Sequence, residues 1–517
     1  MDNEQKLSKD PQSYWMESTK RPVFSELQED LSVDVAIVGG GITGVTAAYL
    51  LVKEGFRVAV LEASSLLGGT TGHTTAKITA QHGLFYDQLI QKLGEEKARL
   101  YYQANKEAGE FVEQVIKLHG IECDFRKEDA YVYTNSADYL KDLDKEAKAY
   151  ETLGIDGGFV EDIPLQIANK GAVVMKNQAQ FHPLKYLTFL VEYIQENGAL
   201  IYENTVVNGM DEGDTMTVKT KNGSNVQAKY VIAASHFPFH DDKGFFARME
   251  PERSYVIAIK SEKPFPGGMY INAEKPTRSV RSANMDGEEI LLVSGDHHKT
   301  GQGKPEMERY QALEQYAQQQ FASHKILYRW SAQDYSTLDK VPYIGRIGKN
   351  QPNLFVGTGY RKWGMTHSNV AALLFTDLIL GRENPYEALF TPSRFDAPQA
   401  SIQKAIKMNA NVAAQLVSGK LESPDKELKD IKPGEGAAVS IKGARAGAYR
   451  NEQGELFVVD TTCTHMGCEV NWNSGDRTWD CPCHGSRFTY EGDIVEGPAK
   501  TPLKKIDPDN IDYTTSK

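Results

Sequence analysis

A run of glycines between two apolar segments constrains the first half of the chain more than any other feature. Val33–Val38 is apolar and rich in β-branched residues, which is typical of a strand buried on both faces. Gly39–Gly44 follows it, and apolar residues then recur at helical spacing up to Lys53. A second apolar segment, Arg57–Leu61, ends at Glu62. The order of strand, glycine turn, helix, strand and acid predicts a parallel βαβ unit.

Each part of this unit suits a bound dinucleotide. Gly39 permits a tight turn, Gly41 lets the backbone approach a pyrophosphate, and Gly44 allows the helix to pack close to the strand. The N–H groups and the dipole at the helix N-terminus favour an anion. Glu62 can accept hydrogen bonds from both ribose hydroxyls and would repel a 2′-phosphate, which disfavours NADP. The alternative is a glycine turn in an unrelated βαβ unit.

The stretch after Glu62 favours FAD over NAD. A second Gly/Thr-rich loop, Leu66–Thr79, stands where an NAD domain would continue into another helix. This loop and several later segments resemble the D-amino acid oxidase-like family of FAD-dependent oxidoreductases, which includes glycine oxidase and sarcosine oxidase. The resemblance covers residues 33–390, and the later segments that carry it, in the order of the family, are 181–207, 230–235, 336–345 and 353–381.

The resemblance implies an α/β Rossmann-like FAD-binding domain with an inserted mixed-sheet substrate domain. The dinucleotide-binding part would lie around residues 33–80, 185–240 and 340–385, with the substrate part between. In this family the start of the last helix faces the O2/N1 edge of the flavin, where a helix N-terminus stabilises negative charge. The residues that the resemblance assigns to FAD are Gly39, Gly41, Gly44, Glu62, Thr71, Val207, Gly359, Gly364, Met365 and Thr366.

The family also implies a reaction, the oxidation of a C–N bond of an amine or amino acid by hydride transfer to the flavin. Several members hold a substrate carboxylate with an arginine where this chain has Asp334, and others use a lysine where Thr366 stands. Asp334 could bind an ammonium group, but it could equally cap a turn or pair with Arg329. No catalytic residue is assigned. The candidates for contact with the substrate are Asp334, Lys362, Arg361, Tyr255 and Arg281, and each could instead be a solvated charge or a packed aromatic ring.

Two histidine features near these motifs leave alternatives open. Some members of the family attach FAD covalently through a histidine near the second loop, and His73 could do so or could be an ordinary hydrogen-bonding residue. His236 and His240 are four residues apart, but Pro238 between them argues against a helix. We therefore expect a loop there and no metal site.

Two cysteine boxes near the C-terminus hold four of the five cysteines of the chain. Cys463-x-His465 in the first box and Cys481-x-x-His484 in the second supply two thiolates and two imidazoles. This set suits a Rieske [2Fe-2S] cluster, in which the cysteines bind one iron and the histidines the other. Tetrahedral zinc is the alternative. The fifth cysteine, Cys123, has the context of a buried or idle thiol.

The boxes, CTHMGC and CPCHGS, resemble Rieske domains of the cytochrome bc type. The resemblance implies a small all-β domain, a disulfide between Cys468 and Cys483, and a hydrogen bond from Ser486 to a cluster sulfur. Gly497–Leu503 resembles the proline-containing loop that covers the cluster. Phe488 replaces a tyrosine whose hydroxyl also donates, and the loss of this donor predicts a reduction potential below the bc-type range.

The segment between the two parts is expected to contain a helix and a polar linker. Apolar residues at helical spacing within 399–419 predict an amphipathic helix, which we expect to cover the flavin domain. The expected domains are therefore 1–390 for the FAD-dependent oxidoreductase, 391–425 for a helical linker and 426–517 for the Rieske domain.

Bulk properties narrow the class of partner. The formal net charge of -12 argues against nucleic acid. The sequence shows no run of about 18 apolar residues, so no membrane span is expected. The N-terminal residues show no apolar signal segment, so we expect a cytoplasmic protein. The expected partners are a small-molecule amine or amino acid and an electron acceptor, either soluble or a quinone.

A flavin site and a one-electron cluster in one chain suggest a relay. The substrate would give two electrons to FAD, and the cluster would take them singly and pass them to an external acceptor. A flavin oxidase that uses O2 and has a structural cluster is one alternative, and a redox carrier or sensor without turnover is another. The sequence identifies neither the substrate nor the acceptor.

Overall fold

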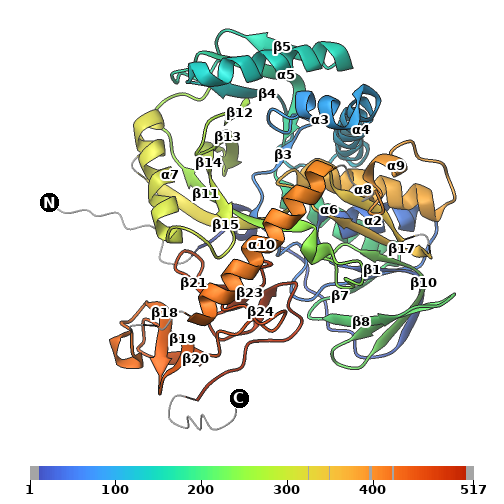
Figure 1. Cartoon of the computed structure of the whole chain (residues 1–517). Helices are drawn as coiled ribbons and strands as arrows, with labels where there is room; N and C mark the ends of the chain where they lie inside the picture. The colour runs from blue at the N-terminus through green and yellow to red at the C-terminus, as the bar shows by residue number, and fades with distance from the viewer. Residues whose placement is uncertain are drawn as a thin grey trace. The chain divides into compact units, whose positions relative to one another are not determined.

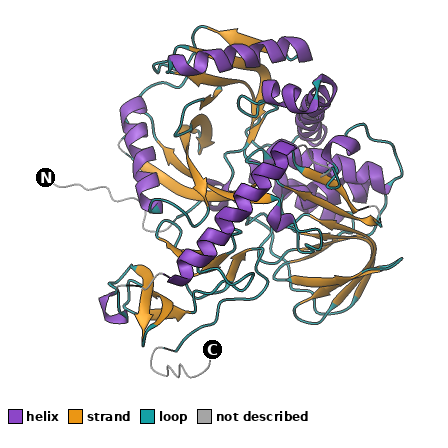
Figure 2. Cartoon of the chain, in the orientation of Figure 1, coloured by secondary structure: helices purple, strands orange, loops and turns teal. Residues whose placement is uncertain are grey.

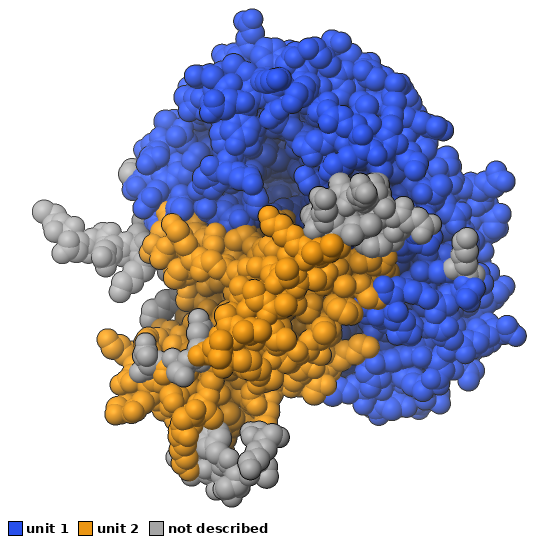
Figure 3. Space-filling view, viewed as in Figure 1, with its two compact units in different colours: residues 1–243, 254–297, 312–396 blue, residues 244–253, 298–311, 397–517 orange. Residues whose placement is uncertain are grey.

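The structure is a computed structural model, which describes residues 11–323, 325–348, 350–394, 399–421, 424 and 426–507, without the side chains of 399–404. The chain divides into two compact units, coloured blue and orange in Figure 3. Unit 1 consists of residues 1–243, 254–297 and 312–396. Unit 2 consists of residues 244–253, 298–311 and 397–517. The second unit thus includes two short segments that lie far before the cysteine boxes in the sequence.

An eight-stranded sheet forms the first layer of unit 1 (Figure 1). Its strands follow the order β16-β17-β10-β1-β2-β7, with β9 pairing β10 and β8 pairing β9. The five strands from β17 to β7 run parallel, as the apolar, β-branched sequence of β1 predicts. The bounds are β1 (Leu31–Val38), β2 (Val58–Leu61), β7 (Leu200–Tyr202), β8 (Val207–Asp211), β9 (Met216–Thr220), β10 (Asn225–Ala233), β16 (Tyr343–Gly348) and β17 (Gln351–Thr358).

Three helices pack against one another beside this sheet. The central helix, α2 (Ile42–Lys53), contacts both α6 (Pro183–Glu196) and α8 (Gly364–Ile379). Most side chains of α2 and α8 are buried, so these two helices have little surface exposed to solvent. The expected βαβ unit is therefore present, although its second strand begins at Val58, one residue later than expected.

A nine-stranded mixed sheet forms the second layer of the chain, in the order β15-β11-β14-β13-β12-β4-β6-β3, with β5 pairing β6. Helices surround it, and Figure 2 separates them from the strands by colour. The strands are β3 (Lys77–Ile78), β4 (Arg126–Thr134), β5 (Gly157–Val160), β6 (Gly171–Gln180), β11 (Met249–Ile259), β12 (Met269–Asn272), β13 (Arg278–Met285), β14 (Glu288–Lys299) and β15 (Ile326–Thr337). The remaining helices before residue 395 are α1 (Tyr14–Glu17), α3 (Tyr86–Leu93), α4 (Glu95–His119), α5 (Leu140–Leu153), α7 (Glu306–Phe321) and α9 (Glu387–Phe390).

The C-terminal part of unit 2 consists of strands and loops apart from the 3-10 helix η4 (Leu428–Asp430) (Figure 2). Its two small sheets are antiparallel throughout. This matches the expected all-β domain. The strands are β18 (Gly436–Ile441), β19 (Ala444–Arg450) and β20 (Leu456–Val459) in one sheet, and β21 (Asn471–Asn473), β22 (Thr478–Asp480), β23 (Arg487–Thr489) and β24 (Ile494–Glu496) in the other.

The predicted helix between the two parts is present as α10 (Gln399–Leu421). It belongs to unit 2, where Val412 packs against the core around the cysteine boxes and Lys420 pairs with Glu469 at 2.9 Å. The expected cover over the flavin domain stays a prediction, because an apolar face alone does not specify which core it covers. Residues 395–398, 422, 423 and 425 of the expected linker lie outside the described residues.

Among the described residues, no helix combines the length and the apolar composition needed to cross a bilayer.

Candidate functional site

The glycine motif forms a turn that only glycine can fill at two positions. Gly39 has φ +113°, and a Cβ there would lie 2.4 Å from the carbonyl oxygen of Ala234. A Cβ on Gly44 would lie 2.0 Å from the carbonyl oxygen of Gly39. Gly41 is the N-cap of α2, and as a glycine it has no side chain that could cap the helix. The turn and the open helix end form a cradle that fits a pyrophosphate.

Two further residues complete this cradle. The Oγ1 of Thr71 accepts from the N–H of Ile42 at 3.1 Å, which fixes the second loop against the start of α2. The carboxylate of Glu62 accepts from the N–H of Gly40 at 2.7 Å and from that of Ser64 at 2.9 Å. Burial raises the pKa of Glu62, and the two N–H donors counteract this effect. Each oxygen keeps a lone pair for a ribose hydroxyl.

The start of α8 lies close to the second loop. Thr366 donates from Oγ1 to the carbonyl oxygen of Thr79 at 3.3 Å, and no described side chain caps the helix from its N-cap, Trp363. Gly359 has φ +75°, which suits the turn that leads into α8. The phenol of Tyr360 lies 3.2 Å from the Oγ1 of Thr43 on α2. The two helix N-termini are therefore joined by direct contacts, as one cofactor site requires.

The structure gives the following positions for the other residues predicted at this site. Gly364 and Met365 form the first turn of α8 with Thr366, and Val207 is buried at the first position of β8. His73 forms a hydrogen bond through Nδ1 with the carbonyl oxygen of Gly69 at 2.8 Å, which fits the ordinary role. His236 and His240 lie in a loop, as expected.

A buried aromatic network borders this site, and the sequence analysis missed it. The Nδ1 of His82 lies 2.6 Å from the phenol of Tyr101, whose oxygen lies 3.0 Å from the Nε2 of His367. His82 also stacks on Trp363, with ring centroids 4.6 Å apart. Burial lowers the pKa of both histidines, that of His367 to about 3, so both are neutral at pH 7. His82 lies in the loop before α3 and His367 lies in the first turn of α8, and neither position gave a sequence signal.

The structure places the substrate candidates on several different elements. Arg361 and Lys362 lie in the turn before α8, with φ +48° and +69°, and the Arg361 guanidinium lies 4.3 Å from the ring centroid of Phe85. Tyr255 and Arg281 are buried within β11 and β13. Asp334 is buried within β15.

The two cysteine boxes form loops of the same geometry in unit 2. In the first, the N–H of Cys463 donates to the carbonyl oxygen of Cys468 at 2.8 Å, and Gly467 has φ +76°. In the second, the N–H of Cys481 donates to the carbonyl oxygen of Ser486 at 2.8 Å, and Gly485 has φ +78°. Each box thus places its first cysteine at the base of a matching loop.

The candidate ligands face one another across these loops. Cys463 and Cys481 are free and buried, and the Cys481 thiol and the Ser486 hydroxyl both lower the pKa of Cys463 by hydrogen bonding to its sulfur. The rings of His465 and His484 are 5.0 Å apart at 90°. Burial lowers the pKa of His484 to about 4, and the Nδ1 of His465 is buried with no hydrogen-bond partner among the described residues. Two thiols and two neutral imidazoles thus fit a [2Fe-2S] group.

The surroundings of the boxes follow the Rieske pattern. Cys468 and Cys483 form a disulfide, so neither can act as a thiolate ligand. Ser486 also accepts from the N–H of Ala499 at 3.0 Å, which holds the proline-containing loop against the second box. Phe488 is buried on β23.

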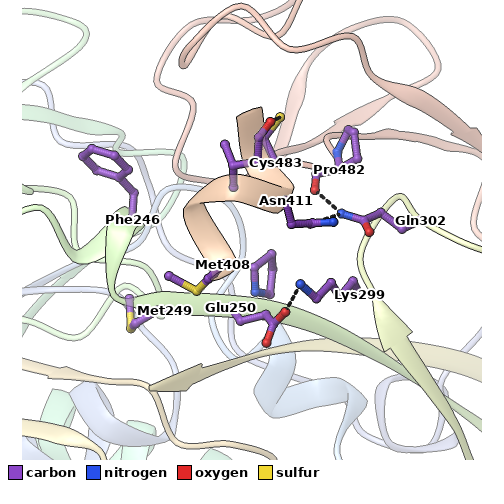
Figure 4. Close-up of a pocket in the computed structure, with 11 residues that line it drawn as sticks. Phe246, Met249, Glu250, Lys299, Gln302, Met408, Asn411, Pro482 and Cys483 are labelled. Carbon is purple, nitrogen blue, oxygen red and sulfur yellow. Dashed lines mark hydrogen bonds and ion pairs between the residues drawn. The ribbon is translucent and has the colours of Figure 1, made fainter. Parts of the chain in front are cut away.

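Segments from the first half of the chain and from its middle line the same site in unit 2. Phe246, in the 3-10 helix η3 (Phe245–Ala247), places its ring 5.6 Å from that of His465 and 5.3 Å from that of His484. Figure 4 shows Phe246 and Cys483 in the wall of one pocket. The Nε2 of Gln302 donates to the carbonyl oxygen of Pro482 at 2.8 Å in the same view. No motif marked these segments in the sequence.

A buried ion pair anchors one of these segments. The Nε of Arg253 donates to the Oδ2 of Asp476 at 3.0 Å, and both side chains are more than nine-tenths buried. Arg487 pairs with the same carboxylate at 3.3 Å. Loss of Arg253 would remove one of the buried cations that neutralise Asp476.

Comparisons with known proteins agree with both sites. A family model described as "FAD dependent oxidoreductase" matches residues 34–378, and one described as "Rieske [2Fe-2S] domain" matches residues 423–507. The "Putative Rieske 2Fe-2S iron-sulfur protein YhfW" of Bacillus subtilis (strain 168) is 49% identical over 510 residues, which cover 98% of this chain and 100% of that protein.

Two more distant relatives match about three quarters of the chain. The gamma-glutamylputrescine oxidoreductase of Escherichia coli (strain K12) is 25% identical over 413 residues, which cover 74% of this chain and 92% of that protein. The crystal structure of glycine oxidase from Geobacillus kaustophilus superposes with a TM-score of 0.61 at 19% identity, covering 71% of this chain and 100% of that one.

Proposed function

Because the chain belongs to the FAD dependent oxidoreductase family and carries a Rieske [2Fe-2S] domain, we propose that it oxidises a C–N bond and passes the electrons to its cluster. The chain binds FAD in the first domain and a [2Fe-2S] cluster in the second. The observation that carries the proposal is this combination, since FAD exchanges electrons in pairs and the cluster exchanges them one at a time.

The names of the relatives support a nitrogen-containing substrate. Gamma-glutamylputrescine oxidoreductase and glycine oxidase are named after an amine and an amino acid, respectively. We therefore propose an amine or amino acid as the substrate class. A small molecule of this class and an external electron acceptor would be the partners.

We propose specific roles for the residues of the FAD site. The open N-terminus of α2 and the cradle at Gly39, Gly41 and Gly44 would hold the pyrophosphate, with Glu62 on the ribose. Thr71 would keep the second loop in place. The remaining predicted FAD residues are Val207, Gly359, Gly364, Met365 and Thr366.

The cluster site has a parallel assignment. Cys463 and Cys481 would hold one iron, and His465 and His484 the other, because the two kinds of ligand lie on matching loops. Ser486 would donate to a sulfur, as its hydroxyl does to Cys463. The spare Cys468–Cys483 disulfide favours the cluster over zinc, because a zinc site has no need for it.

Anaerobic mixing with a panel of amines and amino acids tests the proposal. The visible flavin band should bleach with one of them, and the electron paramagnetic resonance signal of the reduced cluster should then rise. Cys123→Ser should keep that signal, whereas Cys481→Ser should abolish it. Bleaching of the flavin without cluster reduction, with one peroxide formed per substrate in air, would instead establish the oxidase alternative. A cytoplasmic location stays a prediction, which cell fractionation tests.

A further inference from the structure

The segment that precedes β1 has little regular structure and is nevertheless well packed. Within residues 11–30, the single turn α1 is the only helix or strand. Tyr14, Trp15 and Leu27 are all buried. Long segments without regular structure are uncommon in compact domains, and those that occur are usually functional. The contacts that hold this segment against the rest of unit 1 therefore bear on its role.

Three side chains of the segment each donate a hydrogen bond to a backbone carbonyl oxygen of the second Gly/Thr-rich loop. The pairs are Ser13 with Gly72 at 2.6 Å, Trp15 with Thr74 at 2.7 Å, and Arg21 with Leu66 at 2.7 Å. The segment also packs closely on this loop, since a Cβ on Gly72 would lie 2.5 Å from the sulfur of Met16. The second loop is therefore attached to the segment from Leu66 to Thr74.

A buried carboxylate joins the segment and the loop a second time. Glu203, the residue after β7, accepts from the N–H of Phe24 at 2.8 Å and from the N–H of Leu66 at 2.7 Å. The Oγ1 of Thr205 accepts from the N–H of Leu27 at 3.1 Å. A buried carboxylate that loses its donors is costly, so Glu203 favours the state in which both are docked. We call residues 12–27 the strap.

The second loop is bonded to the pyrophosphate cradle through other residues. The N–H of Leu67 donates to the carbonyl oxygen of Gly40 at 3.0 Å, and Thr71 accepts from the N–H of Ile42. The loop is thus bonded to the cradle by one set of groups and to the strap by another. Each bond between strap and loop joins two groups of the chain, so it forms without the cofactor.

We propose that the strap controls the rate at which FAD enters and leaves its site, because the second loop can move off the cradle only when the strap releases it. A contact of equal strength in the free and the bound protein cannot shift the equilibrium between them. It does set how often the loop opens. Weakening the strap should therefore speed entry and release by the same factor and leave the Kd of FAD unchanged. An ordinary binding residue would instead change Kd together with the release rate.

Exchange of bound FAD for isotopically labelled FAD in the full-length holoprotein measures the release rate. Dilution of the holoprotein, followed by flavin fluorescence, gives Kd. Ser13→Ala, Trp15→Phe and Arg21→Met should each speed release about fivefold, because each loses one hydrogen bond to the loop. The triple variant should speed it about a hundredfold, with Kd within about twofold of wild type throughout. Arg57→Met removes an exposed arginine that pairs with Asp34 instead and should release FAD as wild type does.

Hydrogen exchange reports the opening of the strap itself. The amides of Phe24 and Leu27, which donate to Glu203 and Thr205, should exchange faster in Arg21→Met, in parallel with the release of FAD. Four results would each overturn the proposal: a Kd that rises in step with the release rate, unchanged release in all three variants, faster release without faster exchange of these amides, or flavin that stays on the denatured chain. None of these measurements uses a substrate, so a failure of the proposed function would leave the strap intact.

Discussion

The ring of Phe246 meets the ring of His484 edge to face, with centroids 5.3 Å apart at 89°. The same ring lies 5.6 Å from His465. An apolar ring at this distance keeps polar groups and water from the imidazole edge. Phe246 therefore lowers the polarity around the proposed cluster on the side of its two histidines.

Replacement of this ring should change the reduction potential of the cluster. Phe246→Ala should raise it, because the reduced cluster carries one more negative charge and water stabilises that charge better than a phenyl ring does. Redox titration of the full-length protein, followed by the visible spectrum of the cluster, measures the shift. Phe457→Ala, whose ring packs on Tyr449 and Tyr490 instead, should leave the potential unchanged. Equal shifts in the two variants would contradict this role.

Phe488 offers a second test of the same electrostatics. Phe488→Tyr should raise the potential of the cluster, because the added hydroxyl can donate to the proposed cluster ligands beside it in the core. Phe488→Leu adds no donor and should not raise it. A wild-type potential within the bc-type range would contradict the prediction that the missing hydroxyl lowers it.

Gly44 should be intolerant of any side chain. Gly44→Ala places a Cβ 2.0 Å from the carbonyl oxygen of Gly39 and should destabilise the protein by about 1–3 kcal/mol through overpacking. The shift of α2 should also reduce the FAD content. Urea unfolding and the flavin absorbance of the purified protein measure both effects. Gly209→Ala, where nothing lies within 4 Å of the new Cβ, should retain FAD.

The buried Lys77 should make stability depend on pH. Its pKa is about 7 in the folded chain, against 10.5 for an unperturbed lysine, so the unfolded chain binds more protons between these values. Stability should therefore rise with pH in this window. The gain from Lys77 should be about 2 kcal/mol between pH 7 and pH 9, and it should be absent in Lys77→Met. Urea unfolding of both proteins at pH 7, 8 and 9 gives the difference, and parallel curves would exclude the effect.

The disulfide should stabilise the loops of the cluster. Cys468 and Cys483 are 15 residues apart. In the unfolded-chain entropy model, a disulfide that closes a loop of this length stabilises the folded protein by about 3 kcal/mol. The double variant Cys468→Ser/Cys483→Ser should accordingly lose its cluster at a lower urea concentration than wild type. The cluster absorbance during a urea titration reports this, with the flavin absorbance as the internal control. Simultaneous loss of both signals would mean that the disulfide stabilises more than the cluster loops.

Local patterns predicted the parts of both sites that adjacent residues build. Gly39–Gly44 and Glu62 are close in sequence, and the steric reason for each glycine acts within that turn or against the neighbouring strand. The cysteine boxes are equally local, since each loop is closed by hydrogen bonds between residues five apart. The predicted bounds of α2 agree with those in the structure, because the sequence signals that start and end a helix lie at the two ends of this one.

Contacts between distant segments were beyond the reach of such patterns. Lys77 and Arg281 are separated by about two hundred positions, and no local pattern indicated that Lys77 hydrogen-bonds to Ser279, two residues before Arg281. Phe246 is one of many aromatic residues in the sequence, and its contact with His484 depends on where η3 packs. The amphipathic pattern of α10 indicated a buried face but not the core against which it packs.

The anchoring of Asp476 by Arg253 has a practical consequence for anyone who would dissect this protein. A fragment that begins at the linker would lack Arg253, Phe246 and Gln302, which contact the loops of the cysteine boxes and the neighbouring Asp476. In that fragment, the buried carboxylate of Asp476 would lack one of its counter-ions. The C-terminal part of unit 2 is therefore not an independent module. A fragment that contains it should also include residues 244–253 and 298–311.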